Sequence, residues 1–132
     1  MKIGQLAEST GTTTKTIRYY ESIGLLPEPR RLPSGYREFD DASVDRLRFI
    51  RESQSSGLSL AEIQSILELK DAGATSCGHT AALVQRHLDD IDVQIERLQR
   101  SRLDLAEMAV RAATLDAAAC TDPNRCQVIA PD

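Results

Sequence analysis

The spacing of apolar residues in the first 24 positions predicts two short helices. Residues 3–10 place their apolar side chains on one helical face, formed by Ile3, Leu6 and Ala7. Gly11 ends this segment, and the threonine hydroxyls at 12–14 offer an N-cap for a second helix from Lys15 to Ile23, which Gly24 stops. Two short helices joined by a tight glycine-containing turn are typical of a helix-turn-helix.

The next segment has the pattern of a β-hairpin. Two prolines at positions 27 and 29 exclude a helix. Two short extended segments then flank the turn Pro33-Ser34-Gly35, which predicts a hairpin, or wing, after the helix pair.

Two further helices follow the hairpin. One begins at Asp41 and is stopped by Gly57. The other opens with Ser59 and Glu62, the spacing of a capping box. The side chains expected on its buried stripe are Ile63, Ile66, Leu67 and Leu69.

A long segment from His79 to Ala113 contains neither proline nor glycine. Its apolar positions recur in alternating steps of four and three residues, with one charged interruption at Arg102. Such a helix exposes its apolar seam and needs a partner helix, which a second copy of the chain supplies most simply. The residues predicted at this dimer interface are Val84, Leu88, Ile91, Ile95, Leu98 and Leu105.

These patterns predict a mainly α fold in four parts. The parts are a winged helix-turn-helix head at 1–70, a linker at 71–78, a dimerisation helix at 79–113, and a C-terminal loop and tail at 114–132. No apolar run approaches the roughly 20 residues that span a bilayer, and the N-terminus lacks the long apolar stretch of a signal peptide, so we expect a cytoplasmic protein without a membrane partner.

Charge is distributed unevenly along the chain. The net charge is -4, yet residues 1–37 hold six basic and three acidic residues, a net +3, which leaves -7 for the remainder. Lys15, Arg18 and Tyr19 share one face of the second helix, and the arginines at 30, 31 and 37 flank the hairpin tip. A cationic and aromatic face of this kind suits the phosphates and groove edges of DNA.

The string Ile17-Arg18-Tyr19-Tyr20-Glu21, followed by Gly24-Leu25-Leu26 and Gly35-Tyr36-Arg37, resembles the N-terminal domain of MerR-family regulators. The resemblance covers essentially the whole chain and implies a DNA-binding regulator, not an enzyme. It implies an antiparallel homodimer on a palindrome within a promoter whose elements are too far apart. Binding of an effector would bend and unwind that DNA so that RNA polymerase can engage.

The resemblance also assigns roles to individual residues. Lys15, Arg18 and Tyr19 would lie in or beside the major groove, and the wing would hold the DNA backbone through Arg31, Tyr36 and Arg37. Tyr20 and Phe39 are assigned to the core of the head.

Three cysteines indicate the class of signal. An odd number argues against a structural disulfide framework, and thiolates are soft ligands that favour Hg, Cd, Pb, Zn and Cu(I). Roughly 34 helical residues separate Cys77 from Cys120 by about 50 Å, so one chain cannot bring them together. In an antiparallel dimer, Cys77 of one subunit would meet Cys120 and Cys126 of the other, giving two sites per dimer.

The ligand set favours a divalent ion. Three thiolates suit Hg or Pb, and His79 or water as a fourth ligand suits Zn or Cd. The residues Cys77-Gly78-His79 and the loop from Cys120 to Cys126 resemble the divalent-metal branch of the family, whereas the copper(I) branch commonly has serine at the position of Cys77, so Cu(I) ranks lower. In the family the first loop cysteine usually follows the dimer helix sooner than Cys120 does. Metal efflux or detoxification genes are the expected targets.

The sequence offers three alternatives to metal sensing. The thiols could sense oxidants or electrophiles, which needs only an exposed cysteine of low pKa. The protein could bend DNA without any effector, in which case its cysteines would be dispensable. A Cys77–His79 enzyme is disfavoured, because residues two apart at a helix start rarely aim at one another and no oxyanion-hole pattern is visible.

Overall fold

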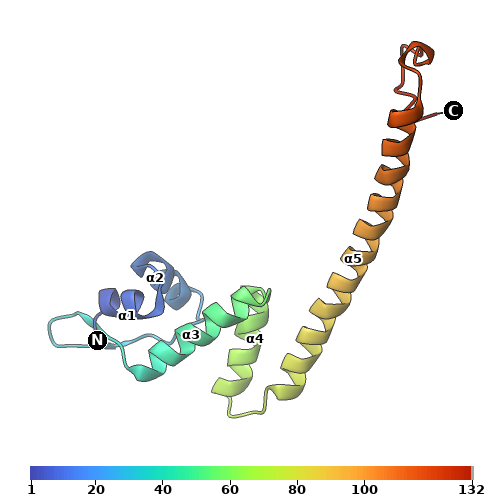
Figure 1. Cartoon of the computed structure of the whole chain (residues 1–132). Coiled ribbons are helices and arrows are strands. Elements are labelled where there is room, and N and C mark those ends of the chain that lie inside the picture. Colours follow the sequence, from blue (N-terminus) through green and yellow to red (C-terminus); the bar gives the residue numbers. More distant parts are fainter. Residues whose placement is uncertain (132) are drawn as a thin grey trace. The chain divides into compact units, whose positions relative to one another are not determined.

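A computed structural model describes residues 1–131 (Figure 1). The protein divides into two compact units, Met1–His87 and the part from Leu88 onward, and we describe each by itself. The first unit holds four helices, the hairpin and the start of a fifth helix, so the predicted mainly α class is confirmed. Within the described residues, no helix is both long and apolar enough to cross a membrane.

The helix-turn-helix forms as predicted. Helix α1 spans Ile3–Thr10, as predicted. Helix α2 spans Thr14–Ser22, which is one residue earlier at each end than the predicted Lys15–Ile23. Gly11 ends α1 with a φ of 67°, a left-handed conformation that glycine adopts without steric cost. The Thr13 side chain then caps α2 by accepting a hydrogen bond from the Thr16 amide at 3.1 Å.

The predicted wing is a two-stranded antiparallel hairpin. Strand β1 is Arg30–Arg31 and strand β2 is Arg37–Glu38, with Arg31 opposite Arg37. Gly35 has a φ of 86° at the turn between the strands. Just beyond β2, the backbones of Phe39 and Met1 exchange hydrogen bonds, which joins the hairpin to the chain before α1.

Helices α3 (Asp41–Ser55) and α4 (Leu60–Asp71) complete the head. The predicted capping box is present: the Glu62 amide donates to Ser59 Oγ and the Ser59 amide to Glu62 Oε1. Arg46 of α3 binds Asp71 through two hydrogen bonds, of 2.7 and 3.0 Å, and this guanidinium holds the pKa of Asp71 below its usual value.

The core lies between these four helices and the base of the wing. Tyr20 and Phe39 are buried in it, as predicted. On α4 the prediction was wrong for Leu69, which is only half-buried, because the buried face of α4 is covered by residues 63, 66 and 67. The side chains with no exposed surface are Leu6, Ile17, Leu25, Leu47, Ile50 and Ile63.

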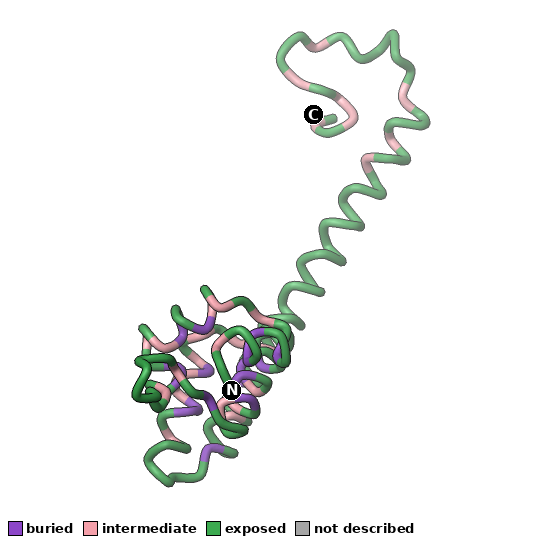
Figure 2. The backbone as a smooth tube through the Cα atoms, turned by 90° about the vertical axis from the view of Figure 1, so that its left-hand side faces the viewer, coloured by how far each residue is buried: buried purple, intermediate pink, exposed green. Residues whose placement is uncertain are grey.

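Helix α5 spans Cys77–Thr114 and starts two residues before the predicted His79. Its first backbone hydrogen bond runs from the Thr80 amide to the Ser76 carbonyl, so Cys77 and Gly78 lie inside the first turn. Figure 2 shows buried positions in the first unit and exposed positions along the later part of α5.

One face of the start of α5 is nevertheless buried. Leu83 is only 5% exposed, whereas the neighbouring Val84 is 51% exposed. The first turns of α5 therefore have two apolar faces, one packed within the first unit and one uncovered in the single chain.

Candidate nucleic-acid interface and metal centre

Helix α2 separates its core residues from its exposed ones. Ile17 and Tyr20 are buried, which fixes the orientation of the helix in the head. Lys15, Arg18 and Tyr19 are all exposed, with Tyr19 at 52%. The three residues of α2 that are predicted to contact DNA thus share a solvent-facing surface of the helix.

The wing presents a second exposed surface. The Arg31 guanidinium donates a hydrogen bond of 3.0 Å to the Gly35 carbonyl, which folds the side chain along the hairpin tip. Tyr36 is 63% exposed, and the Lys2 ammonium lies 5.2 Å from the centre of its ring. This distance is within the range of a cation–π interaction.

A hollow of about 630 Å³ lies where the start of α1, helix α2 and the wing tip meet. Three cationic side chains line it, from Lys2, Arg18 and Arg37, against a single carboxylate, from Glu8. The positive charge of the hollow suits the anionic backbone of DNA, and helix α2 and the wing, the two elements predicted to contact DNA, each supply part of its lining beside α1. Sequence reasoning missed Lys2, which precedes the helix-turn-helix pattern; its positive charge was the only available signal.

Arg37 has a partner within the head. Its Nε lies 3.2 Å from Glu21 Oε2, and the side chains are 28% and 8% exposed respectively. The other Glu21 oxygen is buried without a hydrogen-bond partner. This ion pair connects the end of α2 to strand β2 and holds the wing beside the helix. The sequence predicts a DNA contact for Arg37 but gives no sign of its pairing with Glu21.

A second arginine braces the turn of the helix-turn-helix. The Arg51 guanidinium, on α3, donates to the Gly11 carbonyl at the end of α1. The contact supports the left-handed turn that sets α2 against α1. The sequence pattern gave no sign of this contact, because the two residues are 40 positions apart.

The three cysteines lie beyond or at the ends of α5, and all are exposed. Cys77 is the first residue of the helix, while Cys120 and Cys126 follow its last residue, Thr114. Within the described residues of one chain, no three cysteine, histidine or acidic side chains are grouped closely enough to hold a metal ion. The three-thiolate site, which combines cysteines of two chains, stays a prediction.

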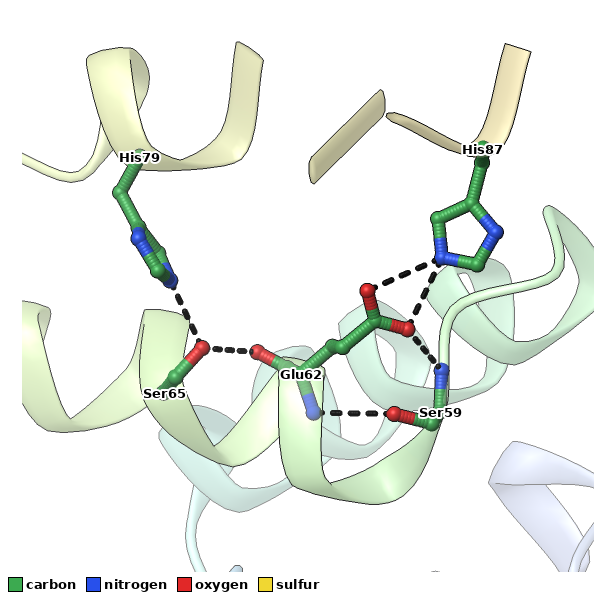
Figure 3. Close-up of polar contacts among 5 residues, drawn as sticks. All are labelled: Ser59, Glu62, Ser65, His79 and His87. Atoms are coloured by element: carbon green, nitrogen blue, oxygen red, sulfur yellow. Dashed lines mark hydrogen bonds and ion pairs between the residues drawn. The ribbon is translucent and has the colours of Figure 1, made fainter. Parts of the chain in front are cut away.

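Both histidines of the chain form hydrogen bonds with side chains of helix α4 (Figure 3). His79 Nε2 lies 2.7 Å from Ser65 Oγ, and His87 Nε2 lies 2.9 and 3.0 Å from the two Glu62 oxygens. The Glu62 pKa is lowered to about 2, mainly by the hydrogen bond from the Ser59 backbone and next by that to His87. Neither contact was predicted, because the capping box already accounted for Glu62.

The loop after α5 has its own hydrogen bonds. A short 3-10 helix, Ala117–Ala119, is capped by Asp116. Asp122 accepts from the Asn124 amide and pairs with Arg125, and Gln127 accepts from the Thr121 amide. Arg111 of α5 donates to the Val128 carbonyl, which ties the end of the loop to the helix. The segment carrying Cys120 and Cys126 is therefore a folded loop.

Comparisons with known proteins agree with this architecture. Residues 1–70 match the family described as MerR HTH family regulatory protein, and residues 44–108 match the one described as MerR, DNA binding. The mercuric resistance operon regulatory protein of Bacillus cereus is 39% identical over 109 residues, which cover 80% of this chain and 83% of that protein.

Solved structures give the same result. The transcription regulator PbrR691 from Ralstonia metallidurans CH34, in complex with lead(II), is 31% identical with a TM-score of 0.74, over 98% of this chain and 96% of that one. HiNmlR, a MerR family regulator lacking the sensor domain and bound to promoter DNA, is 25% identical with a TM-score of 0.59, over 93% and 96% of the two chains. The extent of these matches shows that the chain belongs to the MerR family of helix-turn-helix transcription regulators.

Proposed function

We propose that this MerR-family chain acts as a homodimer that binds a palindromic promoter and activates transcription when a soft divalent ion binds. One observation carries the proposal. Three exposed cysteines stand at the two ends of a 38-residue helix whose apolar seam is uncovered. Pairing two such helices in antiparallel orientation would cover the seam and bring the cysteines together.

DNA binding rests on the exposed face of α2 and on the wing. The exposed Lys15, Arg18 and Tyr19 would enter or border the major groove, and the exposed Arg31 and Tyr36 would hold the DNA backbone. Lys2 joins this set through the hollow that it shares with Arg18. Arg37 would contribute positive charge at the same surface while its Nε faces Glu21.

Dimerisation rests on the seam of α5. In the single chain its six predicted interface residues are between 46% and 69% exposed, although all are leucine, isoleucine or valine. Burying such side chains contributes roughly 1.5–3 kcal/mol each, an upper estimate for a partly covered side chain. The residues are Val84, Leu88, Ile91, Ile95, Leu98 and Leu105.

Metal binding rests on the cysteines. Cys77 of one subunit would meet Cys120 and Cys126 of the other, with Hg, Cd, Pb or Zn as the ion and Cu(I) less favoured. The similarity to a mercuric resistance regulator and to a lead(II)-bound regulator supports this class of ion. Ion capture would order the two helix ends against each other, and DNA distortion would let RNA polymerase engage at metal efflux or detoxification promoters.

A mixed-dimer titration tests the shared site. One protomer carries Cys77→Ser and the other carries Cys120→Ser with Cys126→Ser, and the reduced heterodimer is titrated anaerobically with Cd(II) while thiolate-to-metal absorption is followed. A site shared between chains is intact once per heterodimer, so we expect one ion. The wild-type dimer should bind two, and each mutant homodimer none. A heterodimer that binds no ion while the wild type binds two would exclude the shared site.

The exposure of all three thiols also favours a second candidate, a sensor of oxidants or electrophiles. Treatment of the reduced protein with diamide separates the two. Activation of transcription by diamide, together with failure to bind any of Hg, Cd, Pb, Zn and Cu(I), would favour the thiol switch.

A further inference from the structure

Two histidines in the first turns of α5 form hydrogen bonds with α4. His79, Leu83 and His87 are spaced four residues apart, so they lie on one face of the helix. Leu83 is buried, and the two histidines flank it with hydrogen bonds to α4. This face is distinct from the dimer seam, whose first residues, Val84 and Leu88, are about half exposed.

The receiving residues on α4 are themselves connected (Figure 3). Ser65 Oγ donates a hydrogen bond of 2.6 Å to the Glu62 carbonyl. The Glu62 carboxylate accepts hydrogen bonds from the Ser59 amide and from His87 Nε2. Ser59, Glu62 and Ser65 therefore form one hydrogen-bonded row along the first turns of α4. A displacement of either histidine would pull on that row.

We propose that His79 and His87 are positioning residues that fasten the start of α5 to α4, so that a change at Cys77 is transmitted to the DNA-binding head. Cys77 lies in the turn that His79 anchors. Because α4 packs in the core with α3 and α2, motion passed to α4 reaches helix α2. This proposal deepens the proposed function and rests on it for the identity of the signal.

The proposal gives His79 a role other than that of a fourth metal ligand. Its Nε2 is engaged by Ser65, at hydrogen-bond distance. A Ser65→Ala substitution removes the partner while leaving His79 and the cysteines intact. If His79 is an anchor, Ser65→Ala and His79→Ala should behave alike, and neither should change metal affinity.

Hydrogen exchange of the full-length protein without metal tests the fastening. In chelator-treated protein we expect the amides of residues 80–87 to exchange about tenfold faster in His87→Ala than in the wild type, the effect of losing one charged-group hydrogen bond. Arg86→Ala is the matched control, since Arg86 is an exposed neighbour on the same helix. Exchange in His87→Ala that equals the wild type and the control would overturn the proposal.

A second measurement, with Cd(II), tests transmission. In the wild type and in Arg86→Ala, Cd(II) should change exchange in residues 60–71 of α4 as well as in α5. In the double variant Ser65→Ala/His87→Ala, the change should be confined to residues 77–131, with the same number of ions bound and a Kd within about twofold.

The outcomes separate the two hypotheses. An α4 response that survives in the double variant would refute transmission through the histidines. A more than tenfold loss of Cd(II) affinity in His79→Ala, but not in Ser65→Ala, would make His79 a ligand and overturn its anchoring role. Failure of the wild type to bind any of Hg, Cd, Pb, Zn and Cu(I), with the metal-free exchange still accelerated in His87→Ala, would refute metal sensing and uphold the fastening.

Discussion

Replacing Glu21 by glutamine tests how the wing is attached to helix α2. The substitution keeps the size of the side chain and removes the charge that faces Arg37. The expected change in the free energy of unfolding depends on how deeply Glu21 and Arg37 are buried. Breaking a fully buried pair costs about 3–5 kcal/mol, because the remaining charge has no partner, whereas a fully exposed pair contributes about 0.2–1 kcal/mol.

The Glu21–Arg37 pair lies between these limits. The Glu21 side chain is 8% exposed, but Arg37 is 28% exposed and can turn part of its guanidinium to water once the carboxylate is gone. We therefore expect Glu21→Gln to lower the free energy of unfolding by about 1–2 kcal/mol.

Urea unfolding at one fixed protomer concentration measures this change, since the stability of a dimer depends on concentration. Glu96→Gln is the control: its pair with Arg100 is 62% and 75% exposed, and its loss should cost about 0.5 kcal/mol or less. Equal, small effects of the two substitutions would refute the reasoning that burial gives the wing pair its strength.

Four other outcomes are expected. Leu47→Ala should lower the free energy of unfolding by about 3–5 kcal/mol in urea titrations, because Leu47 has no exposed surface. Thr13→Ala should cost about 1 kcal/mol in the same assay through loss of the α2 cap. Leu98→Asp should yield monomers in sedimentation velocity, since Leu98 is 69% exposed in the single chain and lies on the proposed seam. The Glu62 pKa falls from 4.5 to about 2 on folding, so its stabilising contribution is complete above pH 4.5 and is lost as the pH falls through 2. Between these two pH values, the free energy of unfolding should therefore decrease less on acidification in Glu62→Gln than in the wild type, which urea unfolding at a series of pH values measures.

Local chemistry made much of the head predictable. The threonine cap of α2, the left-handed Gly11 and the Ser59–Glu62 capping box each depend on residues within a few positions of one another. The hairpin followed from two prolines and a turn sequence. In each case the interaction closes within one turn, so spacing along the chain is enough to identify it.

Contacts between elements were less accessible to sequence reasoning. Glu21 and Arg37 are 16 positions apart, and Glu62 and His87 are 25 apart, so no periodicity links them. Their pairing depends on how helices pack, and a glutamate that already fits a capping box gives no sign of a second partner. The cysteines are harder still, because the site they are proposed to form lies between two chains.

The folded loop after α5 has a consequence for the energetics of ion capture. A flexible segment would lose conformational entropy when its thiolates close on a metal, at roughly 1–2 kcal/mol for each residue that is fixed. Here the backbone amides of Ala118, Thr121 and Asn124 already bond to side chains within the loop, and Arg111 holds its far end. Much of that ordering is completed when the protein folds, so a larger part of the metal–thiolate bond energy would remain available as binding affinity.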